Sequence, residues 1–212
     1  EAMHHGNLLV LYIWLYGCFA GALPFVLGGR LTFVQALFEA VSGWTTTGLS
    51  VMDVTVTPPI FLFYRSFMQF CGGLGFVMIM MTFVQGRMGM VLYNAEGHPD
   101  KLMPTLRETV RTIVLMYMAF LAVGVGAYAL CGMPVFDAVL HTMGALSTGG
   151  FSNQTESIGA YHSVAIEGVT VFLMLVGTTN FAILLLLVRR KWRDALRCSE
   201  LRFLGVLCWP SL

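Results

Sequence analysis

The sequence has little charge. Only 11% of its 212 residues are charged, whereas 57% are hydrophobic, and the mean hydropathy is +0.77. A soluble domain carries about 25% charged residues and could not bury this much apolar surface. The composition therefore excludes a water-soluble domain and a disordered chain, and it indicates an integral membrane protein with several spans.

Several chemical signatures are also missing. The net charge is +1, from 12 basic and 11 acidic residues, so nothing points to a nucleic-acid partner. The five cysteines are scattered and form no C-x-x-C pair, which argues against a disulfide framework or a zinc site. We expect no resident cofactor and no transition-metal site. There is no G-x-S-x-G motif, and Ser147 and His141, the nearest nucleophile–base pair, are poorly spaced for one helix face. The sequence therefore predicts that the chain is not an enzyme.

Four apolar runs are long enough to cross a bilayer, which needs about 20 helical residues. The second run extends toward the N-terminus across Arg65. The four predicted transmembrane helices cover residues 8–27, 66–84, 113–133 and 168–188.

Two further apolar runs, residues 32–44 and 134–146, are too short to span. Runs of this length suit re-entrant half-helices, here called pore helices. Thr32 can cap the first, and Pro134 suits the first turn of the second. An amphipathic helix on the membrane surface is the alternative.

The basic residues predict the orientation. Ten of the 12 follow the second or fourth span, and only Arg30 and Arg65 lie on the other side. Both basic segments should therefore be cytoplasmic, and both half-helices should face the outside. The predicted units are a first repeat, a cytoplasmic connection, a second repeat, and a basic segment leading into a further helix: residues 1–86, 87–112, 113–188 and 189–212.

The chain repeats itself with a shift of 102 residues. The sequence TTGLS at 46–50 then falls on TGGFS at 148–152, and Gly75 falls on Gly177. Each unit contains a span, a half-helix, a Thr/Gly-rich turn and a second span. The predicted fold is therefore an all-α membrane protein with two tandem repeats of this kind, as internal repeats of transport proteins suggest.

The two turns place irregular backbone at membrane depth, where its carbonyls need partners. A partly dehydrated cation is such a partner, and glycine lets the chain aim carbonyls inward. The C-terminal end of a half-helix also favours a cation, and neither turn carries a basic residue. Ordinary glycine-containing loops are the alternative. The predicted ion-binding residues are Thr46, Thr47, Gly48, Leu49, Thr148, Gly149, Gly150 and Phe151.

Four ionisable residues near the turns are candidates for supporting roles. Arg65 could bond to half-helix carbonyls, pair with Glu39 or Asp53, or snorkel to the interface. Asp137 lies in the first turn of the second half-helix, where a carboxylate complements the helix dipole. Glu39 and His141 occupy equivalent positions of the two repeats, and we expect them to be buried hydrogen-bonding residues behind the turns, with proton handling as the alternative.

The sequence resembles the TrkH/KtrB superfamily of potassium transporters, and its TrkH branch most closely. The stretches that carry the resemblance are FEAVSGWTTTGLSV, RSFMQFCGGLGFVMIMM, GRMGMVLYNAEGHPDKLMPTLRETVRT, FDAVLHTMGALSTGGFSNQTESIGAY and LMLVGTTNF. The resemblance implies a K⁺ pathway in a bacterial inner membrane, with K⁺ as the cargo. It also implies filter carbonyls around one glycine per repeat, here Gly48 and Gly150.

The resemblance further implies partners. Members of the family have four repeats, so this chain corresponds to a half-pore that lacks repeats three and four. They usually form homodimers with a cytosolic nucleotide-binding regulatory subunit. A non-conducting assembly subunit, a channel with Na⁺ or mixed selectivity, and symport coupled to H⁺ or Na⁺ all remain open from the sequence.

Overall fold

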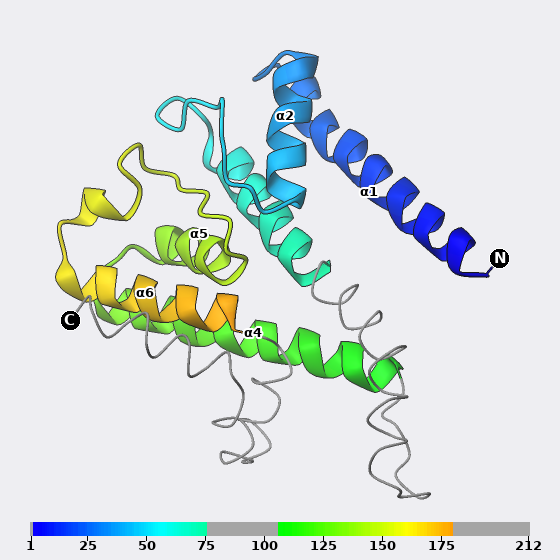
Figure 1. Cartoon of the computed structure of the whole chain (residues 1–212). Coiled ribbons are helices and arrows are strands. Elements are labelled where there is room, and N and C mark those ends of the chain that lie inside the picture. The colour runs from blue at the N-terminus through cyan, green and yellow to red at the C-terminus, as the bar shows by residue number, and fades with distance from the viewer. Residues whose placement is uncertain (1, 76–105, 180–212) are drawn as a thin grey trace, which may run out of the picture.

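A computed structural model of the chain describes residues 2–75 and 106–179, and within these ranges it is helical with no strand (Figure 1). One helix, residues 59–75, ends at the limit of the described range and carries no label; we call it helix 59–75. The other elements are α1 (Ala2–Leu27), α2 (Phe33–Trp44), α4 (Leu106–Leu130), α5 (Val135–Leu146), η1 (Ser157–Tyr161) and α6 (Val164–Thr178). The predicted all-α fold class is confirmed.

Two helices in the described part of the chain are long and apolar enough to cross a membrane. The segments are Val10–Leu27 of α1 and Val110–Leu130 of α4, with mean hydropathies of 1.9 and 2.2. Helix 59–75 and α6 hold the described parts of the other two predicted spans, and residues 76–84 and 180–188 lie outside the description. The basic residues of the last predicted unit, residues 189–212, lie outside it as well.

The long helices expose large apolar side chains. Tyr16 of α1 is 76% exposed and Leu130 of α4 is 92% exposed, and other apolar residues accompany them on both helices. Water does not tolerate such continuous apolar faces, whereas lipid does. The exposed surfaces of α1 and α4 therefore suit the hydrocarbon core of a bilayer.

The half-helices begin and end close to the predicted residues. In α2, the Thr32 side chain accepts from the Gln35 backbone N–H (3.4 Å) while the Gln35 side chain accepts from the Thr32 N–H (3.0 Å), which forms a capping box. In α5, Pro134 occupies the N-cap position, one residue before the expected first turn, and provides no side-chain cap. Each half-helix has 12 residues.

Both long helices end in the same way before their half-helices. Gly29 after α1 and Gly132 after α4 adopt φ angles of +63° and +90°, which glycine accepts without strain. The N–H of the residue after each glycine bonds to a carbonyl five residues back, at 3.1 Å in both cases. This Schellman ending reverses the chain and places α2 beside α1 and α5 beside α4.

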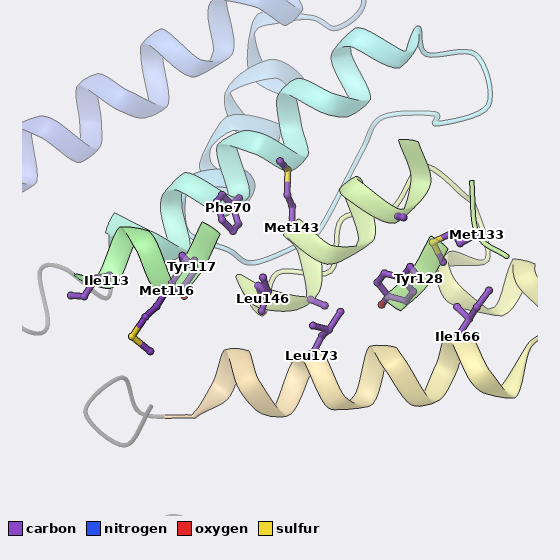
Figure 2. Close-up of a cluster of buried hydrophobic side chains, with 12 residues drawn as sticks. Phe70, Ile113, Met116, Tyr117, Tyr128, Met133, Met143, Leu146, Ile166 and Leu173 are labelled. Carbon is purple, nitrogen blue, oxygen red and sulfur yellow. The ribbon is translucent and has the colours of Figure 1, made fainter. Parts of the chain in front are cut away.

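The two repeats share their hydrophobic cores. Phe70 of helix 59–75 lies in a cluster otherwise formed by the second repeat, with Met143 and Leu146 of α5 and Leu173 of α6 (Figure 2). Conversely, Leu140 of α5 lies in the cluster formed by the first repeat. Packing into these cores favours re-entrant half-helices over the alternative of amphipathic surface helices.

Glycines bring the half-helix ends close to their neighbours. A Cβ on Gly72 would lie 2.1 Å from the Trp44 carbonyl oxygen, and one on Gly177 would lie 2.6 Å from the Leu146 carbonyl oxygen. Helix 59–75 and α6 therefore each pack directly against the last residue of a half-helix. This packing fixes where the following turns begin.

Candidate functional site

The two half-helices lead into turns with the same backbone geometry. We call residues 45–50 the first turn and residues 147–152 the second turn. The Thr47 N–H bonds to the Ser42 carbonyl (2.9 Å), and the equivalent Gly149 N–H bonds to the Gly144 carbonyl (3.0 Å). Since the N–H of a trans peptide points away from the preceding C=O, these bonds direct the carbonyls before Thr47 and Gly149 away from the half-helices.

Left-handed residues occur at the same positions in both turns. Thr46 and Thr148 have φ angles of +55° and +58°, and Gly48 and Gly150 have φ angles of +80° and +79°. The residues between them are not left-handed, so the sign of φ alternates along each turn. Alternation of this kind turns successive peptide planes over and brings their dipoles toward the same side. Two non-glycine residues in this strained region indicate that tertiary structure enforces the shape.

The carbonyls along the middle of both turns accept no hydrogen bond from any described residue. They therefore remain available as ligands for a group outside the described chain. These carbonyls belong to Thr46, Thr47, Gly48, Thr148, Gly149 and Gly150.

The fourth predicted carbonyl of each turn lies differently from the prediction. The Leu49 carbonyl accepts from the Ser42 hydroxyl at 2.6 Å, and a Cβ on Gly144 would lie 3.1 Å from the Phe151 carbonyl oxygen. Both carbonyls therefore turn back toward their half-helices, because the chain must leave the turn there. Three carbonyls per turn are left without a hydrogen bond from the described residues, and their role as ion ligands stays a prediction.

The two turns touch each other through glycine. A Cβ on Gly48 would lie 1.7 Å from the Gly149 carbonyl oxygen, so no larger residue fits at position 48. A cavity of about 520 Å³ lies beside the second turn, between α5, η1 and α6. Its lining includes His141 and Thr170 as well as residues of the turn. The second turn therefore combines irregular backbone with an adjacent cavity, the setting in which such backbone is tolerated at membrane depth.

Glu39 is fully buried behind the first turn. One of its carboxylate oxygens accepts from the Ser50 hydroxyl (2.6 Å) and from the N–H groups of Val51 (2.6 Å) and Met52 (3.0 Å). Charge-assisted bonds of this kind are among the stronger hydrogen bonds in proteins. Glu39 thereby fixes the chain as it leaves the turn.

Arg65 joins the two repeats. It is 2% exposed, and its guanidinium lies 3.7 Å from Glu39 and donates to the Ser50 hydroxyl at 2.8 Å. The same group donates to the Ser152 carbonyl and lies 4.6 Å from the centre of the Phe151 ring. Snorkelling to the interface is therefore wrong for Arg65, and so is pairing with Asp53, whose carboxylate bonds to the neighbouring Thr55 instead.

Asp137 and His141 lie behind the second turn. Asp137 accepts from the Asn153 amide and from the Tyr161 hydroxyl, each at 2.6 Å. Burial and this bond raise the pKa of Tyr161 above its usual value, which already leaves the hydroxyl protonated and able to donate at neutral pH. His141 is 5% exposed, and its ring meets the Tyr161 ring edge-on at 5.7 Å. His141 occupies the position of Glu39 without forming the same contacts.

Some residues at the site are not predicted from the sequence. Ser42 and Ser152 contribute a hydroxyl and a carbonyl to the contacts above, and Gln69 of helix 59–75 accepts from the Phe151 N–H at 3.1 Å. The one signal in the sequence was a polar Gln within an apolar run. In isolation, that residue gives no hint that it reaches the other repeat.

The other predictions concern metal binding and nucleophilic chemistry. Within residues 2–75 and 106–179, no group of three or more His, Cys, Asp and Glu side chains is arranged to hold a metal ion. The Ser147 hydroxyl donates to the Met143 carbonyl at 2.8 Å, and in the described part of the chain it makes no hydrogen bond to His141. The Ser147 hydroxyl therefore bonds to the backbone of its own half-helix.

The chain is similar to known proteins. Residues 1–203 match the model of a family described as TrkH, cation transport protein. The chain is 36% identical to the Trk system potassium uptake protein TrkG of Escherichia coli, over 97% of this chain and 46% of the relative. It is 34% identical to the Trk system potassium uptake protein TrkH of Vibrio parahaemolyticus, over 84% of this chain and 39% of the relative.

A solved structure is also similar. The crystal structure of the potassium transporter TrkH from Vibrio parahaemolyticus matches with a TM-score of 0.73 and 31% identity, over 84% of this chain and 36% of that one. The chain therefore spans less than half the length of these relatives.

Proposed function

The chain belongs to the TrkH family of cation transport proteins, and on that premise we propose that it forms the first half of a potassium uptake permease. K⁺ passes along the two turns and exchanges part of its hydration shell for backbone carbonyls. The carbonyls are those of Thr46, Thr47, Gly48, Thr148, Gly149 and Gly150. The relatives named as potassium uptake proteins support K⁺ as the cargo.

One observation carries the proposal: the alternating left-handed geometry occurs twice, at equivalent positions, in turns whose middle carbonyls accept no hydrogen bond from the described residues. Carbonyl oxygens that replace water are the usual ligands of a selective cation pathway. The C-terminal ends of α2 and α5 add partial negative charge at the start of each turn. Neither turn contains a basic residue that would repel a cation.

The supporting residues hold this geometry. Glu39 and Arg65 fix the exits of the turns through Ser50 and Ser152, and Asp137 fixes the segment after the second turn through Asn153 and Tyr161. His141 lines the cavity beside the second turn. None of these side chains needs to touch the ion to shape its path.

The wider assembly belongs to the same proposal. The protein lies in a bacterial inner membrane, with both turns facing outside and the basic segments facing the cytoplasm. A second half supplies two further repeats, since two turns cannot enclose a pathway and the relatives are more than twice as long as the matched part. The full permease is a homodimer with a cytosolic nucleotide-binding regulatory subunit. Residues 1–86 and 113–188 are its first two repeats.

Rubidium tracer uptake into liposomes tests the proposal. The chain is reconstituted alone and together with the C-terminal half of the Escherichia coli TrkG relative, as wild type, Gly48→Ala and Gly126→Ala. We expect uptake with the added half, and a loss of about tenfold or more for Gly48→Ala, because an L-residue is strained at positive φ and a Cβ there meets the Gly149 oxygen. Gly126 has open space around it, so Gly126→Ala should transport normally.

The alternative, a non-conducting assembly subunit, predicts something else. Well-folded protein with the added half would then show no uptake. Equal uptake by wild type and Gly48→Ala would also contradict the proposed path. Competition by K⁺ and Na⁺ in the same assay decides the selectivity.

A further inference from the structure

Gln69 is the one fully buried amide side chain in the described ranges that reaches from one repeat into the turn of the other. It belongs to helix 59–75 of the first repeat and is 0% exposed. Its Oε1 accepts the N–H of Phe151, in the second turn, at 3.1 Å. An N–H needs an acceptor, so this contact also fixes which end of the amide faces the second turn.

The contact determines where the neighbouring carbonyl points. The Phe151 N–H and the Gly150 C=O belong to one trans peptide plane and face opposite ways. Holding the N–H against Gln69 therefore turns the Gly150 carbonyl away from helix 59–75. We infer that Gln69 is a positioning residue that sets the direction of the Gly150 carbonyl and, resting on the function proposed above, the cation preference of the second turn.

Packing around the amide leaves it little freedom. A Cβ on Gly149 would lie 2.2 Å from the Gln69 amide carbon, so the amide rests directly on the glycine backbone. On the other side, a Cβ on Gly48 would lie 3.8 Å from Gln69 Nε2 and 1.7 Å from the Gly149 oxygen. The amide is therefore wedged against the point where the two turns meet, and it transmits the position of helix 59–75 to both.

Gln69 cannot act as an ion ligand through the end of its amide that faces the first turn. Nε2 is a donor with a partial positive charge, and it has no hydrogen-bond partner among the described residues. A cation does not bind a donor. Gln69 therefore acts through the backbone that it holds.

The internal repeat alone does not explain the contact between Gln69 and Phe151, because the equivalent residue of the second repeat cannot make it. The residue 102 positions after Gln69 is Val171, which is apolar and 56% exposed and cannot accept a hydrogen bond. Arg65, one turn earlier on helix 59–75, also reaches the second turn, at the Ser152 carbonyl. The second turn is thus held at two points by the first repeat, through side chains that the second repeat does not duplicate.

Two substitutions at one position separate the roles. Gln69→Leu removes the acceptor, whereas Gln69→Glu keeps an oxygen at nearly the same place. The matched control is Gln35→Leu, which removes a Gln from the α2 cap and not from the turns. Two quantities are measured on the chain with the C-terminal half of the TrkG relative added. The first is the rate of amide hydrogen exchange at Phe151. The second is the K⁺ preference, that is, how much more strongly K⁺ than Na⁺ inhibits rubidium uptake.

We expect Gln69→Leu to speed exchange at Phe151 about tenfold and to reduce the K⁺ preference by a similar factor. A factor of this size corresponds to the loss of one buried hydrogen bond. Gln69→Glu keeps the acceptor and should retain the wild-type exchange rate at Phe151, and Gln35→Leu should retain both wild-type values. Unchanged exchange in Gln69→Leu overturns the inference whatever the transport result, and so does faster exchange with an unchanged preference. A wild type with no K⁺ preference overturns the inference that Gln69 sets the cation preference. If Gln69→Leu still speeds exchange at Phe151, the Gln69 contact is real and it is the proposed function that has failed.

Discussion

At the scale of single residues, the strongest constraint is a buried charge pair with many partners. Arg65 and Glu39 are 2% and 0% exposed, and burial of an ion is costly unless its bonding capacity is used. Glu39 uses one oxygen for three donors, and Arg65 uses both terminal nitrogens. The pair therefore stabilises the turns only as a complete unit.

Removal of one partner should be worse than removal of both charges. Arg65→Met leaves Glu39 uncompensated and should cost about 3–5 kcal/mol of unfolding free energy. In Arg65→Met/Glu39→Gln the buried charge is gone, and the new Gln can still accept from Ser50, so the loss should be smaller. Denaturant titration in detergent micelles measures both, and an equal or greater loss in the double variant would contradict the coupling.

Sequence reasoning reached some of these residues and not others. Arg65 and Glu39 stand out because a charge in an apolar run needs an explanation. An ion pair between the two is one of the alternatives that the sequence leaves open. Gln69 shows only as an uncharged polar residue in an apolar run, and its partner cannot be predicted because only the packed fold brings the two repeats together. The directions of the Leu49 and Phe151 carbonyls are likewise set by tertiary contacts.

At the scale of elements, helix caps and helix breakers decide which boundaries can be predicted from the sequence. Thr32 and Pro134 mark the starts of the half-helices to within about a residue, because caps and breakers act locally. The start of α4 is less predictable. The helix begins at Leu106 and not at residue 113, since it continues into the charged residues before the apolar run, which a hydropathy criterion excludes.

The cap of α2 offers a test at this scale. Thr32→Ala removes the acceptor for the Gln35 N–H and should lower the unfolding free energy by about 1 kcal/mol. Thr32→Ser keeps the hydroxyl and should be close to wild type. Thermal unfolding in detergent, followed by helical circular dichroism, measures the difference; equal midpoints for Ala and Ser would show that the cap contributes nothing to stability.

At the scale of the whole molecule, the two repeats are interlocked. Phe70 completes the hydrophobic cluster of the second repeat, and Leu140 completes that of the first. Such cross-packing makes the repeats one cooperative unit. The repeat itself could be predicted from the sequence, but the exchange of core residues could not, because identical spacing in two units says nothing about which faces meet.

A core substitution in one repeat should therefore loosen the other. Leu140→Ala in α5 should cost about 2–5 kcal/mol and should speed hydrogen exchange in α1 and α2 as well as in α5. Leu130→Ala is the control, since Leu130 is 92% exposed and its loss should change stability by less than about 0.5 kcal/mol. Faster exchange confined to α5 would show that the repeats unfold independently.

The cross-repeat contacts of helix 59–75 also bear on biogenesis. Helix 59–75 is synthesised before residues 147–152, so Arg65 and Gln69 precede along the chain the turn that they contact. The earlier-made half of the molecule then serves as a template on which the later-made turn acquires its shape. A defect in helix 59–75 would therefore disturb the second turn, a segment that is synthesised afterwards and whose own sequence is intact.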